Sequence, residues 1–472
     1  MRIVSSFIAC ALFGATIPPN QVPFHIEATE DVSREFPDAP KLQSFSFGQW
    51  KGRWVFIGGR IAGYHGVGGA TADFVRADAN REIWVVDTTV KPARTHHVPI
   101  DRLPARLAPV KEQWMSTAQL HYQDGSKLYI CGGYGVDHAG NWVTFPIVSQ
   151  ADLPALIDSV MRGEAPAASI RFASSPAVQS SGGELTKLAD GFFYLAMGHV
   201  FMGSYTAFEG QGEKNGKAAS QSYLNEIRKL KIEPGAAPGT LEVSQAAAFK
   251  DPVEFRRRDM NIGHVLTPKG LGFAVYGGVF TPETQSAYSK PIFVFPDSEP
   301  LIDKSFDQRM NSYNCARLLM YDSQAATMHT TFFGGISGYL WDGANFVENP
   351  RLGAKDKPVY RDGLEWSDQI STISRGKDST TEIVHPDTLP GALGSGAVFI
   401  PLPTVARMTV SPDILDFDKL RGSRTLVGYI YGGIRAFPFH FPYNKNAERY
   451  NSGTVPTRAS EAILKVYIDS RQ

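Results

Sequence analysis

The stretch Leu128-Tyr129-Ile130-Cys131-Gly132-Gly133 is an apolar, β-prone run that ends in a glycine pair, and this pattern returns along the chain. Short apolar runs bounded by turn residues are typical of buried β-strands. Two glycines let the backbone turn with positive φ where neighbouring strands crowd together. The repeat occurs at Gly58 and Gly59, Gly132 and Gly133, Gly277 and Gly278, Gly334 and Gly335, and Gly432 and Gly433, with a degenerate copy at Gly198. These copies predict one structural unit of irregular length.

A short strand is expected before each glycine pair, such as Ser116–Tyr122, and an alternating apolar and polar strand after it, such as Asn80–Asp87. On these motifs the chain resembles the kelch-repeat β-propellers, whose repeats each form one four-stranded blade. The resemblance implies an all-β propeller, and the five glycine pairs with the degenerate copy predict six blades. A seventh is the alternative if the 98 residues from Gly334 to Gly432 hold another.

Kelch repeats are about 50 residues long, and the copies here are spaced more widely, which indicates long loop insertions. One insertion, Ser149–Met161, carries a Ser-x-x-Asp cap followed by apolar residues at helical spacing. It predicts one short helix packed against the propeller.

The composition describes a globular chain without a strong charge bias. Of its 472 residues, 43% are hydrophobic and 20% are charged, with 47 Lys and Arg against 47 Asp and Glu. This balance argues against a nucleic-acid partner. Three cysteines exclude a disulfide-built scaffold and a four-cysteine zinc site.

The N-terminus has the pattern of an export signal. Arg2 is followed by an apolar run from Ile3 to Ala15, which is shorter than the roughly 20 residues that span a bilayer. We therefore expect a signal at residues 1–15, a lead-in segment at 16–40 and a single propeller domain at 41–472, with no transmembrane segment. The protein is expected to be periplasmic, secreted or on the cell surface. A lipid anchor at Cys10 and a buried first strand are the alternatives.

The central funnel of a propeller is its obvious binding site. Aligning the innermost strands by their distance to the glycine pairs places polar groups from several blades there. Arginine suits a carboxylate or an acidic sugar, because its guanidinium binds carboxylates in a bidentate manner. Pairing between blades is the structural alternative for the same side chains. The funnel candidates are Gln113, Ser116, Arg171, Arg258, Asp259, Asn261, His264, Arg309 and Asn314.

Arg258 and Asp259 are the nearest candidates for the arginine and acid that a kelch-type sialic-acid mutarotase would need. As neighbours in an extended strand they are expected to point to opposite faces, so that one ligand would reach only one of them.

The first functional hypothesis is a binding or scaffold module for a glycan or a protein partner. The alternative is a carbohydrate-processing enzyme at the funnel, in the manner of sugar mutarotases, and a third is a subunit of a cell-surface assembly. No Ser-His-Asp, nucleotide or metal motif is recognisable in the chain. Catalytic residues are therefore not assigned, and neither a cofactor nor a metal is expected.

Overall fold

The computed structural model describes residues 21–64, 74–205, 219–349, 363–377, 379–437 and 457–471. The expected signal at residues 1–15, its Cys10 and the first residues of the lead-in lie outside these ranges.

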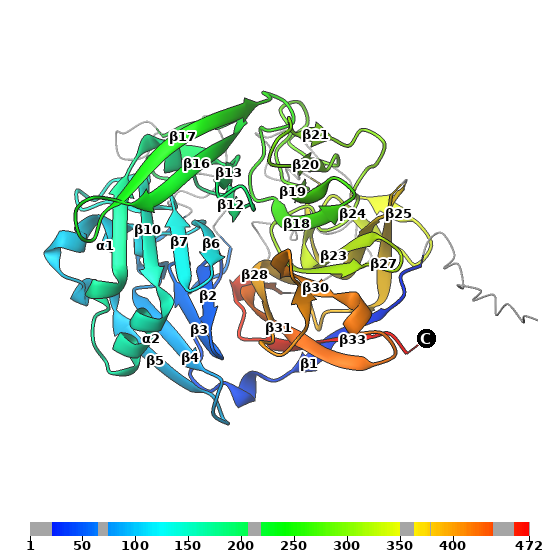
Figure 1. The fold of residues 1–472 in the computed structure, drawn as a ribbon, viewed down its shortest axis with the longest axis horizontal. Coiled ribbons are helices and arrows are strands. Elements are labelled where there is room, and N and C mark those ends of the chain that lie inside the picture. The colour runs from blue at the N-terminus through cyan, green and yellow to red at the C-terminus, as the bar shows by residue number, and fades with distance from the viewer. Residues whose placement is uncertain are drawn as a thin grey trace, which may run out of the picture.

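Six blades, each with a core of four antiparallel strands, surround one axis as a β-propeller, and the innermost strand of each blade lies at the centre of the ring (Figure 1). From the axis outward, blade 1 has β2 (Ser46–Trp50), β3 (Arg53–Ile57), β4 (Glu82–Asp87) and β5 (Arg94–Pro99); blade 2 has β6 (Leu120–Asp124), β7 (Lys127–Cys131), β10 (Ile147–Asp152) and β11 (Ile170–Ser174); and blade 3 has β12 (Glu184–Lys187), β13 (Phe193–Ala196), β16 (Glu226–Pro234) and β17 (Leu241–Lys250). Blade 4 has β18 (Asn261–Thr267), β19 (Gly270–Tyr276), β20 (Ile292–Val294) and β21 (Leu301–Ile302); blade 5 has β22 (Ala316–Asp322), β23 (Thr327–Ser337), β26 (Glu365–Arg375) and β27 (Thr380–Thr388); and blade 6 has β28 (Leu393–Pro401), β31 (Arg424–Ala436), β33 (Ile463–Asp469) and β1 (His25–Asp31).

The predicted all-β propeller is thus confirmed, and the described residues form six blades. The interval from Gly334 to Gly432 holds the outer strands of blade 5 and the innermost strand of blade 6. No seventh blade occurs among the described residues of that interval.

The first strand of the chain closes the ring by completing the last blade. β1 pairs antiparallel with β33, and Ile26 lies opposite Ile468 in the register. Ile26 and Ala28 are fully buried against blade 6. Part of the segment expected as a lead-in is therefore an integral strand, and this joins the two ends of the chain through a hydrogen-bonded sheet.

The glycine pairs form close contacts between blades. Both glycines of all five pairs have positive φ, and in the degenerate copy Met197 takes the first position with a φ of 59°. A Cβ on Gly132 would lie 1.9 Å from the carbonyl oxygen of Ser180 in the next blade, so a side chain has no room there. The amide of the second glycine donates to the next blade in five copies, as in Gly59 to Ser116 O, Gly133 to Ser180 O, Gly198 to Arg257 O, Gly278 to Ser312 O and Gly433 to Leu42 O, at 2.7–2.9 Å.

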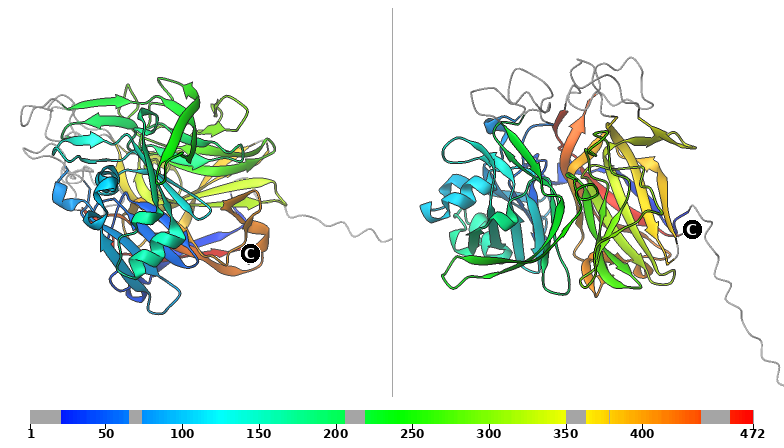
Figure 2. Two further views of the ribbon diagram at one scale, coloured as in Figure 1. Left: turned by 60° about the vertical axis from the view of Figure 1, so that its left-hand side comes forward. Right: turned by 90° about the horizontal axis from the view of Figure 1, so that it is seen from above.

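Two short helices cover the rim beside blades 1 and 2 (Figure 2). The expected helix is α2 (Leu153–Met161), but it begins later than predicted, because Ser149 belongs to β10 and Asp152 supplies the N-cap. The other helix, α1 (Ala108–Trp114), was not predicted. Its Trp114 is fully buried and donates to Ser149.

Further strands extend from the blades. A four-stranded sheet of β8 (Tyr134–Val136), β9 (Trp142–Thr144), β14 (His199–Met202) and β15 (Ser220–Tyr223) joins insertions of blades 2 and 3, and β24 (Tyr339–Trp341) with β25 (Phe346–Glu348) and β32 (Thr457–Ala459) extend blades 5 and 6. Between β28 and β31 the chain forms a hairpin of β29 (Arg407–Met408) and β30 (Ser411–Asp416). β30 pairs in parallel with β22, so it lies inside the ring of innermost strands.

Candidate functional site

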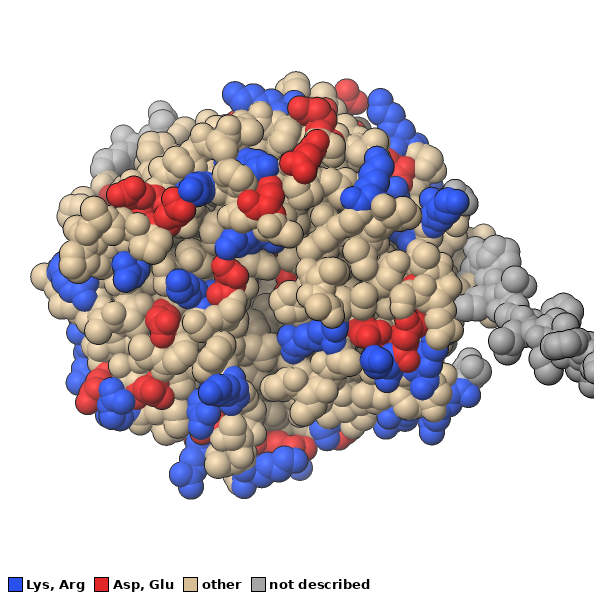
Figure 3. Space-filling model, viewed as in Figure 1, with Lys and Arg blue, Asp and Glu red and all other residues tan. Residues whose placement is uncertain are grey.

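A cavity of about 720 Å³ lies on the propeller axis and is lined by the innermost strands of all six blades. Figure 3 shows a hollow near the centre of the face that carries the β29–β30 hairpin, with charged side chains around it. The cavity contains arginines, carboxylates, histidines and aromatic rings, so it differs from the apolar contacts between the blades. Of the predicted funnel residues, Arg258, Asp259, His264 and Asn314 line it.

Arg258 is a buried cation in the wall of this cavity. Its guanidinium carbon lies 4.7 Å from the ring centroid of Phe280 and 5.8 Å from that of Tyr205. Nη2 donates to the Tyr205 hydroxyl at 3.2 Å, whereas the carboxylate oxygen of Asp259 is 3.6 Å from Nε. Nε itself has no hydrogen-bond partner among the described residues. Buried charges in proteins are normally paired and fully hydrogen-bonded, so this cation has capacity left for an anion.

His199 contacts the same guanidinium and its ring protonation follows from that contact. Nη1 of Arg258 lies 3.3 Å from Nδ1 of His199, and Nε2 of Gln221 lies 2.6 Å from the same nitrogen. A guanidinium can only donate, so Nδ1 accepts and the ring proton is on Nε2. Burial, together with the charge of Arg258, lowers the pKa of His199 well below its usual range. His199 thus presents a neutral Nε2–H that has no partner among the described residues.

Asp259 also lines the cavity, and this corrects the expectation that it points away from Arg258. The expectation assumed an extended strand, but β18 begins only at Asn261 and Asp259 has a φ of 55°. The left-handed backbone breaks the alternation of side chains and turns both groups to one side. Burial raises the pKa of Asp259, although Arg258 and the Tyr313 hydroxyl oppose the shift.

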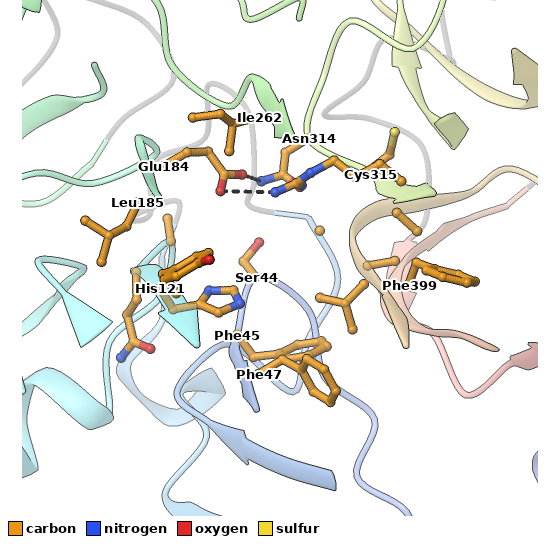
Figure 4. Close-up of a pocket in the computed structure, with 18 of the residues that line it drawn as sticks. Ser44, Phe45, Phe47, His121, Glu184, Leu185, Ile262, Asn314, Cys315 and Phe399 are labelled. Atoms are coloured by element: carbon orange, nitrogen blue, oxygen red, sulfur yellow. Dashed lines mark hydrogen bonds and ion pairs between the residues drawn. The ribbon is translucent and has the colours of Figure 1, made fainter. Parts of the chain in front are cut away.

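A second carboxyl, that of Glu184, lies in the wall of the same cavity. Glu184 of β12 accepts from Nδ2 of Asn314 at 3.1 Å and from Nη2 of Arg317 at 3.3 Å, as the dashed lines in Figure 4 show. Burial raises the pKa of Glu184, and Arg317 partly offsets the rise. His121 projects into the same space from blade 2, where burial and the charge of Arg317 lower its pKa to about 4. The site therefore combines donors for an anion with carboxyl groups that can accept hydroxyl hydrogen bonds.

Gln113 does not line the funnel; it belongs to the wall between strands. Its side-chain amide, which is fully buried, donates to the carbonyls of Ile147, Ile130 and Gly132. Arg257 and Asn311 similarly donate to the carbonyls of Gly277 and Gly334. Each of these three side chains thus donates to the carbonyl of the first glycine of a pair. Their role is to satisfy backbone acceptors where the strand turns.

Ser116 and Asn261 have structural roles as well. The hydroxyl of Ser116 donates to the Gln113 carbonyl at 2.6 Å. Asn261 is fully buried, donates to the carbonyls of Asn311 and Tyr313, and accepts from the amide of Cys315. Neither side chain lines the cavity, so these two predictions were wrong about the funnel, because strand position alone does not distinguish an axial side chain from a blade-to-blade contact.

Two predicted arginines lie away from the axis. Arg171 is on β11, the outermost strand of blade 2, so the alignment that placed it at the funnel was wrong. Arg309 lines a separate, smaller pocket, where its guanidinium carbon lies 5.0 Å from the Tyr339 ring centroid. The innermost strand of blade 3 is β12, which has the sequence Glu-Leu-Thr-Lys and contains no arginine.

Several cavity residues were absent from the predicted set, among them Glu184, His199, Tyr205 and Tyr313. Tyr205 and His199 come from insertions after β13, and Tyr313 comes from the segment before β22. Glu184 is the first residue of β12. It could have been predicted from the sequence if β12 had been recognised as the innermost strand of blade 3. The described residues contain no group of three or more His, Cys, Asp or Glu side chains arranged to hold a metal ion.

The fold and the site together define a six-bladed β-propeller with an amphipathic, arginine-bearing cavity on its axis. The sequence matches no protein-family profile and no curated protein. Among solved structures, YjhT is similar, with 11% sequence identity, a TM-score of 0.49, and coverage of 92% of this chain and 99% of that chain. At this level the likeness says nothing about function. No helix in the described part of the chain is long and apolar enough to cross a membrane.

Proposed function

We propose that the axial cavity binds a small hydroxylated acid of the acidic-sugar type, with its carboxylate on Arg258. The observation that carries the proposal is the buried Arg258 guanidinium, whose nearest carboxylate oxygen lies 3.6 Å away and whose Nε has no hydrogen-bond partner among the described residues. The neutral Nε2–H of His199 is a separate donor on the ring edge that faces away from Arg258. A planar carboxylate can accept two hydrogen bonds from a guanidinium.

The remaining cavity lining suits the hydroxylated body of such a ligand. Glu184 and Asp259 offer acceptors, and Asn314 and Tyr313 line the same space. Aromatic rings such as Phe45 and Phe47 provide apolar surface on the wall opposite Glu184 (Figure 4). Sites for small polar ligands commonly combine apolar walls with a few convergent polar groups. On this proposal the protein is primarily a binding module, and export to the periplasm, the cell surface or the medium remains the expected setting.

A second candidate is acid–base chemistry on the bound sugar, and the two buried carboxyls favour it. Burial raises the pKa of both Glu184 and Asp259, and proton transfer to or from a sugar oxygen requires a group that titrates near the working pH. NMR distinguishes binding alone from turnover, because an enzyme of this kind would speed the exchange between the two anomers of an acidic sugar. Loss of exchange in Glu184→Gln with retained binding would favour the enzyme.

The binding proposal is tested by thermal unfolding with glucuronate, galacturonate and N-acetylneuraminate, and with glucose and galactose as neutral controls. A ligand at about 100 times its dissociation constant adds about 2.7 kcal/mol of stability. We expect stabilisation by an acidic sugar that is lost in Arg258→Gln. The matched control is Arg309→Gln, because Arg309 also lies over an aromatic ring but in a different pocket. Equal stabilisation of both variants would contradict the role of Arg258 and place the binding elsewhere. No stabilisation by any acid would contradict the proposal and favour a protein-binding scaffold.

A further inference from the structure

The β29–β30 hairpin forms part of the cavity wall although it comes from an insertion in blade 6. Its residues Arg407, Pro412, Asp413 and Leu415 line the cavity. It is joined to the inner edge of blade 5 by a short parallel register in which Leu319, Met320 and Tyr321 lie opposite Ile414, Leu415 and Asp416. In Figure 1, β30 lies within the ring, near β18 and β28. A short added strand at this place narrows the cavity on one face of the propeller.

His264 of β18 is the residue that ties this hairpin to the neighbouring blades. Its Nδ1 lies 3.0 Å from Oδ2 of Asp413 and 2.8 Å from the hydroxyl of Ser411. Its Nε2 lies 3.0 Å from the carbonyl oxygen of Lys187 and 3.0 Å from the hydroxyl of Thr186 on blade 3. The ring is 4% exposed, so solvent does not replace these partners.

These contacts discriminate between the protonation states of the ring. A carbonyl oxygen only accepts, so Nε2 carries a proton and donates to Lys187 O. In a neutral ring Nδ1 would then carry a lone pair, which would face the carboxylate of Asp413. In the doubly protonated ring Nδ1 donates to that carboxylate, which is the stronger, charge-assisted type of hydrogen bond. The geometry therefore fits the imidazolium better than the neutral ring.

We propose that the β29–β30 hairpin is a pH-sensitive plug of the axial cavity, latched by protonated His264 and loosened when His264 loses that proton. Histidine is the side chain whose charge ordinarily changes between pH 5 and 8. Proton loss removes the charge-assisted bond to Asp413 and leaves the hairpin held by the neutral Ser411–His264 hydrogen bond and its short register with β22. The hairpin then moves away from the cavity more readily at the upper end of that pH range.

Other charged and titratable groups surround this contact, and two of them, Tyr122 and Arg407, also interact with Asp413. The Tyr122 ring lies 6.0 Å from that of His264, and burial next to Asp413 raises the pKa of Tyr122. Lys187 extends to Asp124 at 2.6 Å. Arg407 donates to the carbonyls of Pro412 and Leu402 and so stabilises the hairpin internally. Asp413 is the carboxylate that faces Nδ1 of His264.

The test is amide hydrogen exchange of residues 402–423 in the full chain at about pH 5.5 and pH 8.0, the two sides of the histidine range. Each rate is divided by the intrinsic rate at the same pH. We expect protection of this segment to fall by about tenfold or more at the higher pH, as for the loss of a hydrogen bond to a charged group. In His264→Gln the difference between the two pH values should vanish, whereas His97→Gln, an exposed histidine paired with Glu82, should behave like the wild type.

Asp413→Asn provides a second variant in case His264→Gln does not fold. Asp413 is partly exposed, and its replacement removes the carboxylate without removing the ring. Loss of the pH dependence in this variant supports the latch. Equal protection of the segment at both pH values in the wild type, or an unchanged pH dependence in both latch variants, would overturn the proposal.

Discussion

Nη1 of Arg258 lies 3.3 Å from Nδ1 of His199, and this contact joins a residue that precedes β18 to the first residue of β14. The guanidinium determines the tautomer of the ring, because it offers only donors. The ring in turn holds one edge of the guanidinium, while Tyr205 holds another. These two contacts fix the orientation of the Arg258 guanidinium in the cavity wall.

The first prediction concerns this pair. In Arg258→Gln the neighbouring cation is lost, so the pKa of His199 should rise, although burial keeps it below the usual range. In the wild type His199 should remain neutral with its proton on Nε2 down to pH 5. Both are read from the ¹⁵N shifts of the imidazole ring by NMR. A wild-type ring that gains charge between pH 7 and 5 would contradict the assigned tautomer and its burial.

The close contacts of the glycine pairs predict that two Gly→Ala substitutions lower the free energy of unfolding by very different amounts. Gly132 and Gly125 both have positive φ, but a Cβ at Gly132 meets Ser180 O whereas a Cβ at Gly125 meets nothing within 4 Å. Gly132→Ala should cost roughly 2–4 kcal/mol, because the blades must move apart. Gly125→Ala should cost about 1 kcal/mol from backbone strain alone. Denaturant unfolding measures both, and similar costs would show that the close approach has little effect on stability.

Buried histidines predict that stability falls in acid. Burial lowers the pKa of His385 to about 3 and that of His329 to about 4, from an ordinary value of 6.5. Between these values and 6.5 the unfolded chain binds more protons than the folded one, so the free energy of unfolding decreases as the pH falls. Each histidine contributes up to about 1.4 kcal/mol per pH unit in this window.

Urea unfolding at several pH values measures this effect in the wild type and in His385→Gln. The variant should be less stable at neutral pH, because the Thr372 hydroxyl loses its contact with His385 at 2.7 Å and keeps only Thr331 as a partner among the described residues. Its stability should also depend less on pH below 6.5. Parallel curves for the two proteins would indicate that His385 becomes charged without unfolding.

For Glu382 we predict that the free energy of unfolding depends on pH with the opposite sign to that of the buried histidines. Burial raises its pKa to about 7 although it accepts from the amides of Arg309 and Met310. From the ordinary 4.5 up to about 7 the folded chain binds its proton more tightly than the unfolded one. This contribution to stability is therefore complete below pH 4.5 and is lost as the pH rises to 7. In Glu382→Gln this loss of stability, up to about 1.4 kcal/mol per pH unit, should disappear. Urea unfolding between pH 5 and 7 measures it, and an unchanged slope of the free energy of unfolding against pH would contradict the prediction.

Local sequence patterns were sufficient to predict the blades. Apolar runs that end at Gly58, Gly132 or Gly277 need only neighbouring residues to form a strand and a turn, so their positions could be found without the structure. Sequence analysis also placed Arg258 and Asn314 at the axis correctly. It placed Gln113 and Arg171 there wrongly, because spacing to a glycine pair does not tell an axial strand from a capping residue or an outer strand.

The sequence by itself determined that the chain folds as a propeller, since repeated strand and glycine signals are local and each copy reinforces the same unit. The tertiary structure decided which polar groups meet on the axis. The left-handed turn at Asp259 directs that carboxyl beside Arg258, and insertions bring His199 and Asp413 from other blades. These contacts join residues that are far apart in the chain and meet only when the blades assemble into a ring. A local sequence pattern therefore cannot predict them.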